Sequence, residues 1–180
     1  KNDFQSVTTK FTESDVLQES YKMLGESQIA LQEFGDGAHT FSQLLSINNI
    51  TKENRQTGSF NLAWCSFKAK KYQDAVKYFD KFLKDYPGNA LNEDASFWLS
   101  ESYFLAGDFK NSIKNYAAFL NNYKNSKRFP DALYGLAWSY FKANEFSNAA
   151  QTFEEFTEKY PSSEFTYDSY LRLAECYYNL

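Results

Sequence analysis

The sequence predicts an all-α fold built from repeated pairs of helices. Only 7 of its 180 residues are glycine and 3 are proline, which disfavours disorder and a β-sandwich or barrel with many tight turns. When the chain is compared with itself, aromatic and small residues recur at a spacing of 37 along most of its length. The fold class is therefore predicted to be an array of stacked helix hairpins with a period of 37–38 residues.

The repeat is carried mainly by aromatic positions that coincide in three successive copies. These positions hold Phe67, Phe104 and Phe141; Tyr72, Phe109 and Phe146; Phe79, Tyr116 and Phe153; Phe82, Phe119 and Phe156; and Tyr86, Tyr123 and Tyr160. A leucine followed by a small residue recurs as well, at Leu62, Leu99, Leu136 and Leu173. Chance does not align so many aromatic residues at one period.

Each repeat is predicted to contain two helices, called helix A and helix B. In the copy over residues 54–87, small and apolar side chains lie on one face of each helix. They are Leu62, Ala63, Ser66 and Ala69 on helix A, and Ala75, Phe79, Phe82 and Tyr86 on helix B. Pro87 and Gly88 end helix B, because proline cannot continue a helix and glycine can cap one. One hairpin cannot bury its own apolar face, so neighbouring hairpins must stack.

The whole chain is predicted to be one segment of a longer array. Residues 1–11 are expected to be a half repeat, followed by full repeats over 14–48, 54–87, 91–124 and 128–161 and a final half repeat over 165–180. Natural arrays end in units with a polar outer face, and neither end has one. An excised segment is therefore expected, whose truncated ends would allow self-association.

Three copies follow the tetratricopeptide (TPR) pattern of Leu plus a small residue, Tyr, Ala, Phe and Pro at fixed spacing. They hold Leu62-Ala63, Ala75, Phe79 and Pro87; Leu99-Ser100, Tyr103, Ser112 and Tyr116; and Leu136-Ala137, Tyr140, Ala149, Phe153 and Pro161. The early Trp of the pattern is replaced by Ser59, Ser96, Leu133 and Tyr170, Lys124 replaces one proline, and the period exceeds the family's 34. With these departures, the chain resembles the TPR family over nearly its whole length.

The resemblance implies a right-handed α–α superhelix, the TPR solenoid, that binds a protein or peptide segment without catalysis. The long period and phrases such as residues 82–87 are similar to a bacterial envelope subtype, that of the Tol–Pal coordinator protein and the outer-membrane barrel-assembly TPR lipoprotein. This subtype favours the periplasm or the cell envelope, and a cytoplasmic location stays open.

No catalytic, metal or cofactor site is predicted, so the chain is not expected to be an enzyme. The single histidine, His39, has no clustered Cys or carboxylate and is interpreted as a structural or surface residue. Gly35-Asp36-Gly37 lacks the further ligands of a phosphate or calcium loop and is placed at the turn between helices A and B. Cys65 and Cys176 occupy the same helix A position three repeats apart, too far for a disulfide, and are interpreted as packing residues.

Composition also restricts the partners. The formal net charge of −4 offers no basic excess for nucleic acid, and no apolar run is long enough for direct membrane insertion. The basic cluster is interpreted as a solvated helix face rather than an anion site. It consists of Lys68, Lys70, Lys71, Lys77, Lys81 and Lys84.

A second aromatic face of helix A, off the stripe that packs on helix B, is predicted to line the partner-binding groove that the TPR resemblance implies. Its residues are Phe60, Trp64, Phe67, Phe97, Glu101, Phe104, Tyr134, Trp138, Phe141 and Glu175. Glutamate shares a register with Trp64 and Trp138, so that position is expected to face water and both tryptophans to be partly exposed anchors. Ordinary inter-helix packing is the alternative for Phe67, Phe104 and Phe141.

The predicted function is a protein–protein interaction scaffold or adaptor. Its partner is expected to present apolar, aromatic or proline side chains and one cation near Glu101. Two other hypotheses stay open: an architectural array whose aromatic face packs on its own chain or another copy, and a region that regulates an enzyme domain elsewhere.

Overall fold

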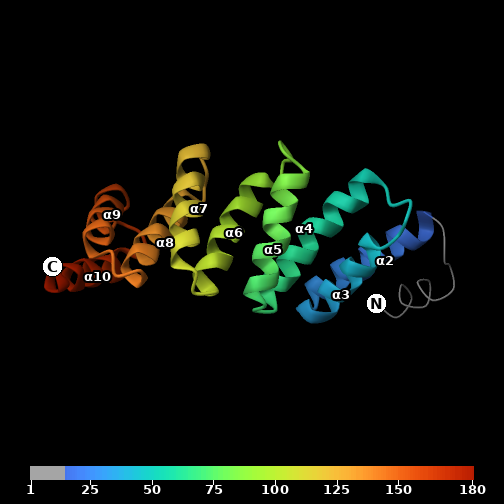
Figure 1. Cartoon of the computed structure of the whole chain (residues 1–180), viewed down its shortest axis with the longest axis horizontal. Coiled ribbons are helices and arrows are strands. Elements are labelled where there is room, and N and C mark those ends of the chain that lie inside the picture. The colour runs from blue at the N-terminus through green and yellow to red at the C-terminus, as the bar shows by residue number, and fades with distance from the viewer. Residues whose placement is uncertain (1–14) are drawn as a thin grey trace. The chain divides into compact units, whose positions relative to one another are not determined.

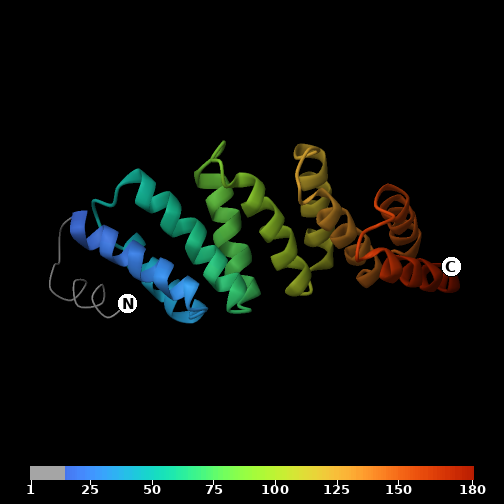
Figure 2. The same cartoon turned by 180° about the vertical axis from the view of Figure 1, so that it is seen from behind.

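The structure is a computed structural model that describes residues 15–180 (Figures 1 and 2). The predicted half repeat over residues 1–11 lies outside the described residues. Within residues 15–180 every regular element is an α-helix, and no strand occurs. The predicted all-α fold class is confirmed.

The chain divides into two compact units, residues 1–95 and 96–180. Unit 1 contains α2 (Asp15–Ala30), α3 (Phe34–Leu45), α4 (Lys52–Lys68), α5 (Tyr72–Asp85) and the start of α6 (Asn92–Leu105). Unit 2 contains the rest of α6, then α7 (Phe109–Asn122), α8 (Phe129–Lys142), α9 (Phe146–Lys159) and α10 (Thr166–Asn179). Consecutive helices pack as hairpins, and helix B of one hairpin also contacts helix A of the next one within its unit, as α3 contacts α4 and α7 contacts α8.

The turn from helix A to helix B has the same backbone geometry in every described hairpin. One residue in each turn has a positive φ, at Gln32 (59°), Lys70 (60°), Gly107 (80°) and Asn144 (60°). In the third turn the Asp108 N–H donates to the Tyr103 carbonyl at 2.9 Å and the Gly107 N–H to the Phe104 carbonyl at 3.0 Å, the two bonds of a Schellman cap. The other three positions hold non-glycine residues, for which a left-handed backbone conformation is unfavourable. The free energy gained by closing the hairpin therefore exceeds this cost.

Gly35-Asp36-Gly37 is not the turn that the sequence predicted. The cap centred on Gln32 already reverses the chain, and α3 begins at Phe34, so these three residues lie inside the first turns of helix B. Gly37 packs closely on the next helix A, because a Cβ there would meet the Cys65 sulfur at 2.9 Å.

The core is formed by two large apolar side chains from each described helix B, Phe41 with Leu44 in α3 and two aromatic rings in α5, α7 and α9. Phe79 with Phe82, Tyr116 with Phe119, and Phe153 with Phe156 are all at most 1% exposed. Each pair packs on helix A of its own hairpin and, within a unit, against the next helix A, as Tyr116 and Phe119 do with Ala132 and Leu136. The predicted stacking of neighbouring hairpins is confirmed within each unit.

Part of the predicted groove belongs to this core. The Phe60 ring lies 5.9 Å from Phe79 and 5.6 Å from Phe82, and Phe97 and Tyr134 contact the corresponding pairs. The prediction that Phe60, Phe97 and Tyr134 lie off the face that packs on helix B is therefore wrong. A large ring on the flank of helix A reaches its helix B, which spacing along one helix does not reveal.

The remaining interpretations of single residues agree with the structure. His39 and all six lysines of the basic cluster are exposed. Cys65 and Cys176 are free and fully buried, as expected for packing residues, and burial raises the pKa of the Cys65 thiol to about 12.

We expect Gly25→Ala to destabilise the protein by about 1–3 kcal/mol, because the added methyl would meet the buried Phe41 ring at 2.6 Å. Gly35→Ala is the matched control, since its Cβ would meet nothing within 4 Å and the helix would gain up to about 1 kcal/mol. Urea unfolding of both variants measures the difference. Equal changes in unfolding free energy would show that Gly25 is not needed for close helix approach.

Candidate functional site

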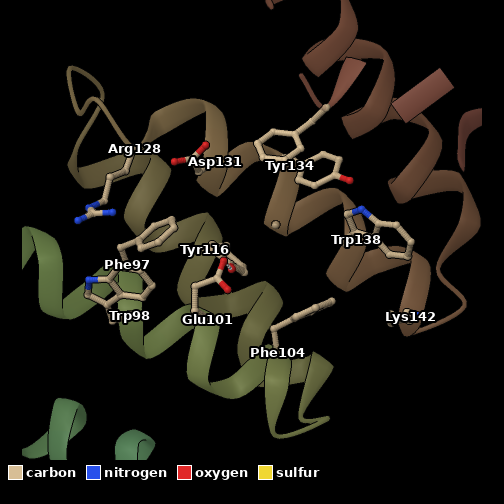
Figure 3. A pocket seen from close by; sticks show the side chains of 12 residues that line it. Phe97, Trp98, Glu101, Phe104, Tyr116, Arg128, Asp131, Tyr134, Trp138 and Lys142 are labelled. Atoms are coloured by element: carbon tan, nitrogen blue, oxygen red, sulfur yellow. Dashed lines mark hydrogen bonds between the residues drawn. The ribbon is translucent and has the colours of Figure 1, made fainter. Parts of the chain in front are cut away.

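Unit 2 contains a pocket of about 590 Å³ between the exposed sides of α6 and α8, with Tyr116 of α7 beneath it (Figure 3). Its walls are mainly aromatic. They are formed by Phe97, Trp98 and Phe104 from α6, Tyr134 and Trp138 from α8, and Phe165 from the segment before α10. Large aromatic walls with a few polar groups are typical of a binding pocket.

Two cations of the chain lie against these walls. The Arg128 guanidinium is 5.0 Å from the ring centres of both Phe97 and Trp98, and the Lys142 ammonium is 5.3 Å from Trp138. These are cation–π distances. Figure 3 shows Arg128 and Lys142 at opposite ends of the pocket.

The centre of the pocket is acidic. The buried Tyr116 hydroxyl donates a hydrogen bond to the Glu101 carboxylate, and the two groups point toward each other in Figure 3. Burial raises the pKa of Glu101, an effect that the Tyr116 hydrogen bond opposes and the Asp131 charge increases. Burial also raises the pKa of Asp131, while Arg128 lowers it. For Tyr116, burial and the Glu101 charge raise the pKa well above its usual value.

Gly135 keeps the pocket open. A Cβ at this position would lie 2.5 Å from the Tyr116 ring and 2.6 Å from its hydroxyl oxygen. The missing side chain lets the tyrosine rise far enough between α6 and α8 for its hydroxyl to reach Glu101. Gly135 and the Tyr116–Glu101 hydrogen bond are thus parts of one arrangement.

The structure brings five of the ten predicted groove residues together in this pocket. They are Phe97, Glu101, Phe104, Tyr134 and Trp138. Phe141 and Glu175 belong to the same unit but do not line it. The Phe141 ring packs on Trp138 and Phe146, and Glu175 pairs with Arg172.

Phe60, Trp64 and Phe67 lie in unit 1, on α4. Trp64 stacks on Phe67 with ring centres 5.9 Å apart and has the Lys68 ammonium 5.4 Å from its own ring. Trp64 and Trp138 are both half-buried, so their predicted partial exposure is confirmed. Their role as anchors stays a prediction.

The alternative interpretation of Phe67, Phe104 and Phe141 as inter-helix packing residues agrees with one ring contact that each of them makes. Phe67, Phe104 and Phe141 each meet the first aromatic residue of their own helix B, with ring centres 5.7–5.8 Å apart. Phe104 also lines the pocket, so packing and pocket formation are compatible in this ring. The expectation of a water-facing glutamate position is correct for the exposed Glu26 and wrong for Glu101, which is desolvated between α6 and α8.

Seven lining residues were not predicted as part of the site. They are Trp98, Tyr116, Arg128, Asp131, Gly135, Lys142 and Phe165. A usable signal was present in the repeat itself. Tyr116 stands where two other copies have Phe79 and Phe153, and Glu101 stands where the same two copies have Trp64 and Trp138, although Glu26 and Glu175 also occupy that position. The Tyr116 hydroxyl and the Glu101 carboxylate meet in the pocket.

The described residues contain no group of three or more His, Cys, Asp or Glu side chains that could hold a metal ion. None of the described helices is both long enough and apolar enough to cross a lipid bilayer. The lining of the pocket consists of aromatic rings, two carboxylates, two cations and Gly135.

We expect Glu101→Gln to become more stable relative to the parent chain as pH rises from 4 to 7. The raised pKa of Glu101 means that its charged form is disfavoured in the fold, so its contribution is favourable below the ordinary value of 4.5 and is lost as pH rises through the folded value. Glutamine keeps an acceptor for Tyr116. Thermal unfolding across this range measures the difference, with the exposed Glu26→Gln as control; a difference that does not change with pH would contradict the desolvation of Glu101.

The chain is similar to known repeat proteins. The tetratricopeptide repeat family profile matches residues 58–89, 94–126 and 131–163, together more than half of the chain. No curated protein sequence matches it significantly. Proteins with TPR repeats generally bind protein or peptide partners and are scaffolds rather than enzymes.

Solved structures share the fold at low sequence identity. A tetratricopeptide repeat protein from Parabacteroides merdae has a TM-score of 0.72 and 14% identity over 99% of this chain and 64% of its own. PilW, a widely conserved type IV pilus biogenesis factor, has a TM-score of 0.72 and 15% identity over 93% of this chain and 72% of its own. YrrB, a TPR protein with an unusual peptide-binding site, has a TM-score of 0.70 and 14% identity over 97% of this chain and 81% of its own. With three matched repeats and this fold, the chain belongs to the tetratricopeptide repeat family.

Proposed function

We propose that this chain is a non-catalytic scaffold that binds a segment of a partner protein, with the pocket of unit 2 as its main site. The observation that carries the proposal is the pocket of about 590 Å³, whose walls are mainly aromatic, with the Tyr116–Glu101 pair between two cations at its ends. Such a pocket can bury an apolar side chain and orient its neighbours. Of the other predicted groove residues, the half-buried Trp64 would extend the contact surface in unit 1, and Phe141 and Glu175 would do so in unit 2.

A role in assembly at the bacterial cell envelope is part of the proposal. Its support is the sequence resemblance to the envelope subtype of TPR repeats and the structural similarity to PilW, a type IV pilus biogenesis factor. The similarity to YrrB, which has an unusual peptide-binding site, supports a peptide segment as the bound form of the partner.

We expect Phe104→Ala to weaken binding of a selected peptide at least tenfold, because it removes a ring from the pocket wall. A phage-displayed library of random dodecapeptides selected on the whole chain provides the peptide, and isothermal titration calorimetry measures its affinity. Phe67→Ala is the matched control. It deletes an equivalent packing contact, with ring centres 5.8 Å apart instead of 5.7 Å, but lies outside the pocket.

Phe67→Ala should change the affinity less than threefold. If no peptide is selected, or if Phe104→Ala binds as well as the parent chain, the pocket is not the binding site.

A second candidate function, an architectural array, is favoured by α10. This helix exposes Tyr167 (89%) and Tyr178 (91%) together with Tyr170, Leu171 and Tyr177, an apolar surface suited to packing on a second copy. If it does so, sedimentation velocity will show association that rises with concentration and falls in the Tyr167→Ser/Tyr178→Ser double variant. A monomer at all concentrations would exclude this candidate.

A further inference from the structure

We propose that the pocket of unit 2 receives a basic side chain of the partner segment, an arginine by preference, with Glu101 and Asp131 as its counter-charges. This inference rests on the proposed function and specifies the chemistry of the partner. It is argued from an equivalent site in the next repeat, where the chain supplies the arginine itself.

That equivalent site lies between α8 and α10. The Arg172 guanidinium is 5.3 Å from the centre of the Trp138 ring, and its Nε donates to Asp168 Oδ1 at 3.3 Å. Glu175 accepts a further hydrogen bond from Arg172, and the Tyr134 hydroxyl donates to Asp168 Oδ2 at 2.7 Å. A guanidinium is thus held in this repeat by an aromatic face and two carboxylates.

The pocket is the same site one repeat earlier, with the arginine missing. Residues 37 positions before those of the Arg172 site line it: Asp131 corresponds to Asp168, and Gly135 corresponds to Arg172. The aspartate that pairs with the arginine is therefore retained, while the arginine is replaced by a glycine, against which the Tyr116 ring packs.

Trp138 stands where the Arg172 site has Glu175, so one carboxylate of that site is lost, while two further replacements act in the opposite direction. Glu101 stands where the Arg172 site has Trp138, so a second carboxylate takes the place of the ring beneath the guanidinium. Phe97 stands where that site has Tyr134, so Asp131 lacks the hydroxyl donor that Asp168 receives. Both changes favour a cation between α6 and α8.

The chain's own cations do not satisfy Glu101. Its hydrogen-bond donor is the neutral Tyr116 hydroxyl, and within residues 15–180 no lysine or arginine forms an ion pair with it. Arg128 lies over Phe97 and Trp98, and Lys142 lies over Trp138, at the two ends of the pocket. The raised pKa values of Glu101 and Asp131 agree with carboxylates that lack part of their compensation.

The test uses peptides selected on the whole chain from the random dodecapeptide library. A basic residue shared by the selected peptides is replaced in synthetic peptides by citrulline if it is arginine, or by norleucine if it is lysine. We expect the neutral replacement to weaken binding at least tenfold to the parent chain and less than threefold to Glu101→Gln. Glu26→Gln, the exposed carboxylate at the corresponding position of α2, is the control and should behave as the parent chain.

The outcomes separate this inference from the proposed function. One contrary result is a set of selected peptides that bind Phe104→Ala more weakly than the parent chain and yet share no basic residue. Another is a shared basic residue that can be neutralised without loss of affinity. Either result would overturn the inference and leave the scaffold function in place. An equal loss in the parent chain and in Glu101→Gln would place the cation elsewhere and overturn it too. Absence of any pocket-dependent peptide would overturn both.

Binding should also weaken as pH falls from 7 toward 4, because protonation of Glu101 and Asp131 removes the counter-charges. The groups that face them are Tyr116 from α7 and Arg128 at the start of α8, with Glu164 acting on Asp131. A selected peptide without histidine or carboxylates isolates the contribution of the protein. The pH dependence should be smaller in Glu101→Gln than in the parent chain, and an unchanged dependence would contradict the assignment of Glu101.

Discussion

Burial of two large apolar side chains from each described helix B, both aromatic in α5, α7 and α9, is the interaction on which the rest of the structure depends. Aromatic residues are weak helix formers, and helices of about 14 residues are marginal in water, so these helices need packing to persist. A fully buried Phe contributes about 1.5–3 kcal/mol, whereas an exposed pair such as Lys81–Asp85 is screened by water and contributes much less. The aromatic core therefore outweighs the surface ion pairs.

The same requirement determines where the chain can tolerate variation. A helix B ring must reach the helix A before it and, within a unit, the helix A after it, so glycine or alanine is needed where the backbones approach closely. Gly25 beneath Phe41 meets this requirement and does nothing else. Gly135 above Tyr116 meets it too, but there the ring carries a hydroxyl that bonds Glu101. Close packing of a ring on a glycine thus forms a core contact in unit 1 and the centre of the pocket in unit 2.

The position held by Arg172 in one repeat is held by Gly135 in the repeat before it. Between α8 and α10 the space beside the aspartate is filled by Arg172, which is held by Asp168 and Glu175 over Trp138. Between α6 and α8 the aspartate remains, the arginine is a glycine, and the ring beneath is a glutamate. Repetition makes this comparison possible inside one molecule, since the fold supplies the same backbone positions and only the side chains differ.

The sequence by itself determined the helices, their pairing into hairpins and the buried stripe of helix B. Period and amphipathic spacing are properties of neighbouring residues, and the ring pairs from Phe79 with Phe82 onward follow them directly. Half of the predicted groove residues also proved to line the pocket. The pocket residues that were missed include Tyr116 of α7, Gly135 of α8 and Arg128 just before α8, which only folding brings together with α6.

Only the tertiary structure decided the environment of Glu101. Its register with Trp64, Trp138 and Glu26 indicated a surface position, and Glu26 is indeed exposed. Glu101 is desolvated because Tyr116 rises beneath it and α8 lies across from it, and both depend on the absence of a side chain at Gly135. A linear pattern states which face of a helix a residue occupies; what packs against that face depends on residues from other helices, which only the folded chain brings together.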